Sequence, residues 1–256
     1  LYAVIPVPTE GAEEVTNGSF NTSIPIGTAG SGWAKVVSGD CTVEYDNGGV
    51  KLTQANVGSQ DCKVYAQTVG GSNNLLTVGK QYKVTYEVVS NNNSTSLKYY
   101  RGGSYLDINH TVGTHTFYYK QETNQLSIFW NLTANSDITL DNVSCKEVGQ
   151  DWTLGGTDWS IGDSKLIGVN AITETSQQIL PTTIARNLKI SFDIVVDSGS
   201  IAVYMTDESK NWITSSTSII KYVNSSSKIL EIDGRNSDPF NGSVTNISVK
   251  EIGQGW

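Results

Sequence analysis

Two stretches of the chain alternate strictly between apolar and polar residues. They are Tyr82–Val89 (YKVTYEVV) and Leu188–Val195 (LKISFDIV), and in both the apolar residues occupy every second position. An alternation of period two is typical of a β-strand with one buried face. No stretch keeps a helical period of apolar residues over three turns. The pattern therefore predicts a protein built from strands.

Shorter stretches of the same kind are separated by turn signals rich in Gly and Asn. Examples are DNGG at 46–49, SNNNS at 90–94 and TVGT at 111–114. Many short strands at regular spacing indicate an antiparallel β-sandwich. The strands predicted in the first half of the chain are Cys41–Tyr45, Val50–Gln54, Lys63–Thr68, Lys80–Ser90, Ser96–Arg101, Thr114–Lys120, Gln125–Trp130 and Ile138–Glu147.

The two halves of the chain repeat one another. NVSCKEVGQDW (Asn142–Trp152) aligns with NISVKEIGQGW (Asn246–Trp256), and the segment after Trp152 resembles the segment after Trp33. We therefore predict two copies of one module in tandem. Residues 1–14 form an extended N-terminal arm or linker, 15–150 form module 1 and 151–256 form module 2. Trp33, Trp152 and Trp256 hold equivalent positions, so Trp256 begins a further joint or a third copy.

The closing strand of module 1 contains an irregularity. Its apolar phase shifts between Leu140 and Val143, and Asp141 and Asn142 lie at the shift. One extra residue in a strand produces such a shift, so the pattern predicts a β-bulge at this point.

Composition and charge limit the possible partners. The 256 residues carry a net charge of −8, and no run of Lys and Arg occurs, which argues against a nucleic-acid partner. No apolar run approaches 18 residues, so we expect no membrane insertion. The three cysteines have no metal-type spacing. Cys41 and Cys62 could pair if their strands are neighbours, but free buried thiols are the favoured interpretation because Cys145 occupies a core position.

The sequence contains no complete catalytic motif among the classes considered. Gly162–Ser164 reads GDS, as in lipase-like esterases, but that chemistry needs a histidine beside the serine. Both histidines, His110 and His115, lie in module 1, and no cysteine cluster or close carboxylate completes a metal set with them. The 25 acidic residues form no motif of the paired kind that glycosidases use. We interpret GDS as a hairpin turn and expect no enzyme activity.

Aromatic residues gather around one Gly-Gly turn. Sugar recognition uses a flat ring against the apolar face of a pyranose, with polar groups that fix the hydroxyls. Tyr99 and Tyr100 are adjacent in a strand, so only one can be in the core. Core packing is the alternative role for all these rings, and Tyr204, Trp212 and Tyr222 occupy similar ground in module 2. The candidate sugar platform comprises Tyr99, Tyr100, Arg101, Tyr105, Asp107 and Trp130.

Several framework motifs resemble a known class of modules. VTNGSF (15–20), YKVTYEVV, GTHTF (113–117) and ITLDNVSCKE (138–147) are similar to carbohydrate-binding-module-type jelly rolls of the galactose-binding-like class. The joint KEVGQDWTLG resembles tandem modules of bacteriophage virion proteins, such as fibres. The resemblance implies an all-β fold of two tandem antiparallel β-sandwich (jelly-roll) modules.

The same resemblance implies a structural calcium ion in module 1. Modules of this class hold the ion with a strand aspartate, here Asp141, and with oxygens near the N-terminal segment. Asn17 and Glu14 are the candidate neighbours, since calcium takes six to eight oxygen ligands. Thr245 replaces the aspartate in module 2, so we expect no calcium there. No other cofactor is expected.

The functional expectation follows from this resemblance. The chain would be a non-enzymatic structural protein of a virion surface, a fibre or decoration. It would contact other virion proteins as a homo-oligomer and adhere to host surface glycans through weak, repeated sites. One alternative is a purely structural spacer without sugar binding, and another is a secreted bacterial carbohydrate-binding protein. Exposed rings beside Arg101 and Asp107 favour adhesion, whereas buried rings favour the spacer.

Overall fold

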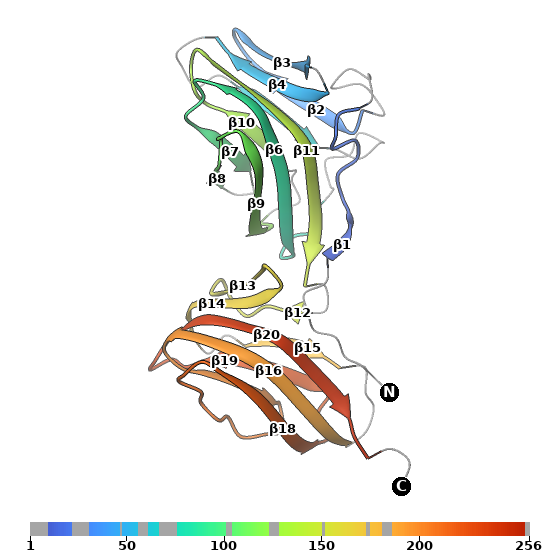
Figure 1. Cartoon of the computed structure of the whole chain (residues 1–256), viewed down its shortest axis with the longest axis vertical. Helices are drawn as coiled ribbons and strands as arrows, with labels where there is room; N and C mark the ends of the chain where they lie inside the picture. Colours follow the sequence, from blue (N-terminus) through green and yellow to red (C-terminus); the bar gives the residue numbers. More distant parts are fainter. Residues whose placement is uncertain are drawn as a thin grey trace. The chain divides into compact units, whose positions relative to one another are not determined.

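The computed structural model describes residues 10–21, 31–46, 48–55, 61–66, 76–100, 104–122, 128–149, 152–172, 175–180 and 186–253. The described elements are all β-strands, arranged in four antiparallel sheets, which confirms the predicted fold class. No helix in this described part is long and apolar enough to cross a membrane. The chain forms two compact units, one of which comprises Gly11–Glu147, while the other contains the residues from Val148 onward (Figure 1). We keep the names module 1 and module 2 for these units.

Module 1 contains two sheets (Figure 1). The first has the strand order β3-β4-β11-β6-β9, with β1 beside β11, and the second has the order β2-β5-β10-β7-β8. The strands are β1 (Glu10–Glu13), β2 (Trp33–Val37), β3 (Cys41–Asp46), β4 (Gly49–Gln54), β5 (Cys62–Ala66), β6 (Gln81–Asn92), β7 (Leu97–Tyr100), β8 (Tyr105–Ile108), β9 (Gly113–Lys120), β10 (Ile128–Asn131) and β11 (Ser136–Val148).

Module 2 repeats this topology. Its sheets have the orders β13-β14-β20-β16-β18 and β12-β15-β19-β17, which match the two orders of module 1 strand for strand, apart from β1 and β8. The strands are β12 (Trp152–Thr153), β13 (Trp159–Gly162), β14 (Lys165–Ala171), β15 (Ser176–Ile179), β16 (Arg186–Ser198), β17 (Ile201–Met205), β18 (Thr217–Ser225), β19 (Ile229–Gly234) and β20 (Phe240–Glu251).

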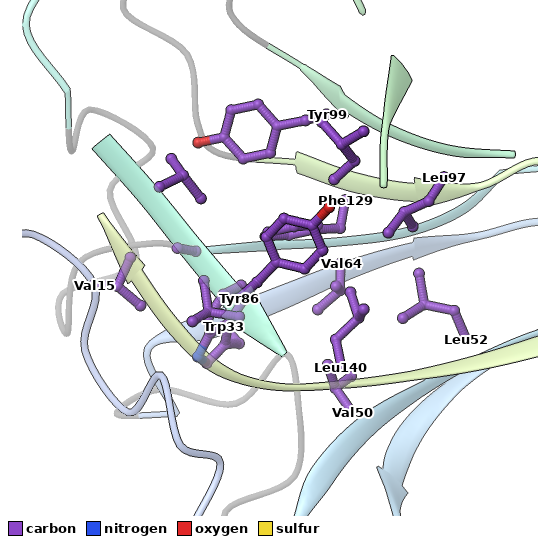
Figure 2. Packing of buried hydrophobic residues seen from close by; sticks show 14 of the residues in the cluster. Val15, Trp33, Val50, Leu52, Val64, Tyr86, Leu97, Tyr99, Phe129 and Leu140 are labelled. Carbon is purple, nitrogen blue, oxygen red and sulfur yellow. The ribbon is translucent and has the colours of Figure 1, made fainter. Parts of the chain in front are cut away.

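The core of module 1 lies between its two sheets. Alternate residues of each strand point inward, so that Tyr86 and Leu140 from the first sheet pack with Val64, Tyr99 and Phe129 from the second (Figure 2). The rings of Tyr99 and Phe129 lie edge to face, with centroids 5.2 Å apart. Burial of these large side chains is the main stabilising contribution, at about 25 cal/mol per Å² of apolar surface.

The repeated tryptophans begin equivalent strands. Trp33 is the first residue of β2 and is fully buried, and its Nε1 donates a hydrogen bond to Asn17 O at 3.0 Å. Trp152 is the first residue of β12 and is also buried. Both tryptophans are therefore buried at the start of equivalent strands, and Trp256 lies outside the described residues.

The predicted bulge is present in both closing strands. Asn142 and Asn246 have positive φ values of 48° and 51°. The register between β16 and β20 shifts between Ser191 and Asp193, which lie opposite this point in module 2. Asparagine tolerates the left-handed conformation better than most residues, because its short polar side chain bonds locally.

The expectation that Cys41 and Cys62 are free thiols is wrong. They form a disulfide with Cα atoms 5.5 Å apart, whereas Cys145 is buried and takes no part in a disulfide. Cys41 lies in β3 and Cys62 in β5, which belong to different sheets. Both side chains face the same core, so the disulfide links the two sheets of module 1. Sequence pattern alone does not show which strands face each other across a sandwich.

Candidate functional site

The outer face of the sheet β2-β5-β10-β7-β8 carries the candidate site. In β7, Leu97 and Tyr99 are buried in the core, and the alternation therefore directs Lys98 and Tyr100 outward. Tyr105 on β8 lies directly opposite Tyr100 in the ladder, and so it shares this outer face. These side chains are presented on adjacent strands of a rigid sheet rather than on a loop.

Three of these outward rings form a continuous cluster. The centroids of Tyr100 and Tyr105 are 4.9 Å apart, and those of Tyr105 and Trp130 are 5.0 Å apart. Trp130 lies on β10, between β5 and β7. Tyr105 is 38% exposed, and the other two side chains are half-buried. We call Tyr100, Tyr105 and Trp130 the aromatic platform.

Charged groups surround the aromatic platform. Lys98 Nζ lies 2.7 Å from Asp107 Oδ1, and Lys63 Nζ lies 2.6 Å from Asp61 Oδ1. The same Lys63 Nζ is 4.1 Å from the centroid of the Trp130 ring, a cation–π distance. Ion pairs at a surface contribute only about 0–1 kcal/mol, so a ligand hydroxyl can compete for these groups at little cost.

The structure separates the predicted platform residues. Tyr99 is fully buried, and its hydroxyl shares a hydrogen bond of 3.0 Å with that of Tyr119, so it belongs to the core. Asp107 is exposed and paired with a lysine, and Arg101 lies outside the described residues. Sequence reasoning missed Lys63 and Tyr65, which the alternation of β5 directs to the same outer face. The pattern CKVYA, read as a half-buried strand, contains the signal that would have found them.

The calcium candidate Asn17 is occupied by contacts within the protein. Its Nδ2 donates hydrogen bonds to Ser31 O and to the Tyr45 hydroxyl, both at 3.3 Å. Its backbone φ of 56° places it in a tight turn before β2. These contacts hold the N-terminal segment of module 1 against the sandwich.

The other two calcium candidates have different neighbours. Burial raises the pKa of Glu14, and Glu147 adds to the rise by repulsion. Burial also raises the pKa of Asp141, whose Oδ1 accepts a hydrogen bond from Asn142 N at 2.6 Å. Among the described residues, no three His, Cys, Asp or Glu side chains gather where they could hold a metal ion. The calcium site therefore stays a prediction.

The GDS motif is a turn. Asp163 and Ser164 have φ values of 49° and 59° and connect β13 with β14, as the sequence pattern predicts. His115 lies in module 1, and its Nε2 is 2.7 Å from Thr111 O. Ser164 and His115 therefore belong to different modules.

Module 2 carries different chemistry at the position equivalent to the platform. Asp233 follows the buried Ile232 of β19, as Trp130 follows the buried Phe129 of β10. Asp233 is fully buried, and its Oδ2 accepts hydrogen bonds from the Tyr204 hydroxyl at 2.7 Å and from Lys210 Nζ at 2.5 Å. Burial raises the pKa of Tyr204, and its hydrogen bonds to neighbouring carboxylates add to the rise. A hydrogen-bonded network of Asp233, Tyr204 and Lys210 thus occupies this position.

Comparison with known proteins adds little. No family model matches the chain, and no curated protein matches it. A similar solved structure is the N-terminal CBM22-1–CBM22-2 tandem domain of Paenibacillus barcinonensis Xyn10C, with 12% identity over 99% of this chain and 93% of that one, at a TM-score of 0.35. Another is a Paenibacillus xanthan lyase, with 13% identity over 98% of this chain and a TM-score of 0.32. The chain corresponds to only 27% of the lyase, and neither likeness supports a function.

Proposed function

We propose that the chain is a non-enzymatic glycan-binding protein, and that the aromatic platform of module 1 holds the sugar. The contiguous rings of Tyr100, Tyr105 and Trp130 on a solvent-facing sheet support this proposal most strongly. Trp130 also packs partly against the core of module 1, whereas the exposed surfaces of the three rings are apolar faces that complement the C–H face of a pyranose.

Polar groups at the platform suit the hydroxyls of a sugar. Lys98 and Asp107 lie in register beside Tyr100 and Tyr105, and they offer donors and acceptors at one edge of the rings. Lys63 does the same beside Trp130. The positive and negative groups are balanced, so this site favours a neutral glycan. A shallow site of this kind binds weakly, and many copies on one particle multiply the affinity.

The biological setting that we propose is the surface of a virion. The chain would serve as a fibre or decoration protein, assemble as a homo-oligomer with other virion proteins, and adhere to host glycans. The repeated joint KEVGQDW/KEIGQGW supports this setting through its resemblance to phage modules. The disulfide between Cys41 and Cys62 supports an extracellular location independently, because disulfides persist in oxidising surroundings such as virion and cell surfaces.

A glycan array tests this proposal. The two-module chain would be displayed multivalently and screened against bacterial surface glycans, with calcium and with a chelator. Truncating one stacked ring removes about 1–1.5 kcal/mol, so we expect Tyr105→Ala and Trp130→Ala to weaken binding about tenfold. Val36→Ala is the matched control, because Val36 is exposed on the same sheet face, at β2.

The outcomes separate adhesion from the spacer role. Binding that is lost in both ring variants and kept in Val36→Ala supports adhesion through the platform. If the chain binds no glycan on the array, or if the ring variants bind as the unchanged chain does, the adhesion proposal is overturned and the structural spacer is favoured. Amide hydrogen exchange of each variant would show that module 1 remains folded.

A further inference from the structure

One exposed ring of module 2 lies on the other sheet, at its edge. β18 is the last strand of the order β13-β14-β20-β16-β18, and β16 is its one partner among the described strands (Figure 1). Its residues alternate in exposure, and Tyr222 is 66% exposed. An exposed tyrosine of this kind contributes little to the stability of a sandwich.

A shallow hollow of about 250 Å³ adjoins this ring. Asn187 lies directly opposite Asn224 in the ladder, and Asn224 Nδ2 donates a hydrogen bond of 2.9 Å to Asn187 Oδ1. Ile252 N donates to Asn187 O at 2.9 Å, which holds the apolar Ile252 beside the two amides. The lining residues are Asn187, Tyr222, Val223, Asn224, Ile252 and Gly253.

Two lysines lie beside the hollow. Lys189 is opposite Tyr222 on one side and opposite Lys250 on the other, so that the three form one row across three strands. Like charges directly opposite each other destabilise a sheet. Neither lysine forms an ion pair with any described residue, although the chain as a whole carries a net charge of −8. A bound anion would relieve this repulsion.

We propose that this surface of module 2 binds an acidic saccharide, one that carries a uronic or sialic carboxylate. The sugar ring stacks on Tyr222, its carboxylate lies between Lys189 and Lys250, and the amides of Asn187 and Asn224 bind its hydroxyls. The ligand class follows from the chemistry of the row, in which one aromatic face, two ammonium groups and two amides are side by side. This site does not depend on the platform of module 1.

The equivalent surface of module 1 lacks the amide pair. Lys83 lies opposite Tyr118 there, as Lys189 lies opposite Tyr222. Two residues along the strand, module 2 has the pair Asn187 and Asn224. Module 1 has Gln81 opposite Lys120 at this position, and Gln81 is buried. We therefore assign the acidic-saccharide site to module 2 only.

The test uses the full chain and a defined set of probes. These are tetrasaccharides of galacturonic acid, of hyaluronan and of α-2,8-linked sialic acid, each beside its carboxyl-reduced counterpart. Binding is measured by titration calorimetry at low and at high salt. Tyr222→Ala and Lys189→Gln are the site variants. Ile220→Ala is the matched control, because Ile220 is 61% exposed on the same face of β18 but does not line the hollow.

We expect at least one acidic tetrasaccharide to bind, and about a tenfold loss of affinity on carboxyl reduction or in either site variant. Ile220→Ala and Tyr105→Ala should bind that probe as the unchanged chain does, and high salt should weaken binding. No binding of any acidic probe, or binding that survives both site variants, overturns the proposal. Because Tyr105→Ala removes only the platform, failure of one site is distinguishable from failure of the other.

Discussion

The equivalent outer faces of the two modules differ although their strand orders match. Module 1 presents Trp130 with Tyr100 and Tyr105 to solvent, whereas module 2 has the buried Asp233 at the position of Trp130. Lys210 closes over Asp233, so the ring of Tyr204 is not available. The repeat therefore keeps the framework and changes the surface. A binding role found for one module cannot be transferred to the other by alignment alone.

The two cores differ in the same way. In module 1, Val43, Leu52 and Ile138 lie in one row across β3, β4 and β11. In module 2 the corresponding row is Trp159, Gly168 and Gly242.

The glycines of this row make room for aromatic rings. A Cβ on Gly168 would lie 2.6 Å from Phe240 Cδ1 and 3.1 Å from Trp159 Cζ3. Trp159 and Phe240 stack with their centroids 5.8 Å apart. In module 2 two aromatic rings fill this part of the core, whereas in module 1 three aliphatic side chains fill it. A core tolerates such a change in side chains when their total volume is kept.

Truncating a side chain in these core rows should have the largest effect on the free energy of unfolding. Trp159→Ala should lower the free energy of unfolding of module 2 by about 4 kcal/mol, because it leaves a large cavity beside Phe240. Val43→Ala, the equivalent change in module 1, should cost about 2 kcal/mol, since it removes far fewer buried atoms. Amide hydrogen exchange measured in each module gives the two values separately. Equal losses would contradict the different distribution of core volume.

The next largest effect comes from the disulfide, which module 1 has and the described part of module 2 lacks. The linked cysteines are separated by 21 residues, and closing a loop of that length stabilises the fold by about 3 kcal/mol. A Cys41→Ala, Cys62→Ala double variant should therefore lower the midpoint of module 1 unfolding in urea and leave module 2 unchanged. Dithiothreitol should do the same to the unchanged chain. If the midpoint moved in neither case, the linked segment would have to remain ordered in the unfolded state of module 1, so that the disulfide would remove no chain entropy there.

Much of the framework could be predicted from the sequence, because it is local. Strict alternation located β6 and β16, and the phase shift located the bulge at Asn142. The disulfide and the burial of Tyr99 could not be predicted in the same way, because both depend on which strands face each other. The predicted strands do not include β8, Tyr105–Ile108, because its four residues are too few to show a clear alternation. The alternation of β5 indicates that Lys63 points outward, but no sequence motif marks it as a site residue.

The two bulges provide a matched pair with a smaller effect. Asn142 Nδ2 donates to Glu87 Oε2 at 2.7 Å, and Asn246 Nδ2 donates to Asp193 Oδ2 at 2.6 Å. Asn142→Ala and Asn246→Ala should each cost about 1–2 kcal/mol, since alanine loses the hydrogen bond and tolerates positive φ poorly. Glycine at the same positions should recover the part of the loss that is due to the backbone. Urea unfolding measures all four variants, and a large loss in one module only would mean that the bulges are not equivalent.

The smallest effect is a difference in pH dependence between the modules. Hydrogen bonds from the Ser225 hydroxyl and from the backbone of Ser226 and Ser227 lower the pKa of Asp207 in module 2 from 3.8 to about 2. Since the folded pKa lies below the unfolded one, this carboxylate stabilises module 2 above pH 3.8 and loses that effect as the pH falls toward 2. The group is largely exposed, so screening by solvent limits the contribution to about 1 kcal/mol or less.

In module 1 the sign is reversed, because burial and the carboxylates of Glu147 and Glu13 raise the pKa of Glu14 above 4.5. Ionised Glu14 therefore opposes folding at neutral pH, and module 1 should gain stability as the pH falls through the folded pKa of this group. Glu14→Gln should remove that gain, and Asp207→Asn should remove the acid-induced loss in module 2. Urea midpoints of both variants, measured at pH 7, 4.5 and 2.5, test the two signs. If module 2 of the Asp207→Asn variant still lost stability near pH 2.5, its acid sensitivity would be due to other carboxylates.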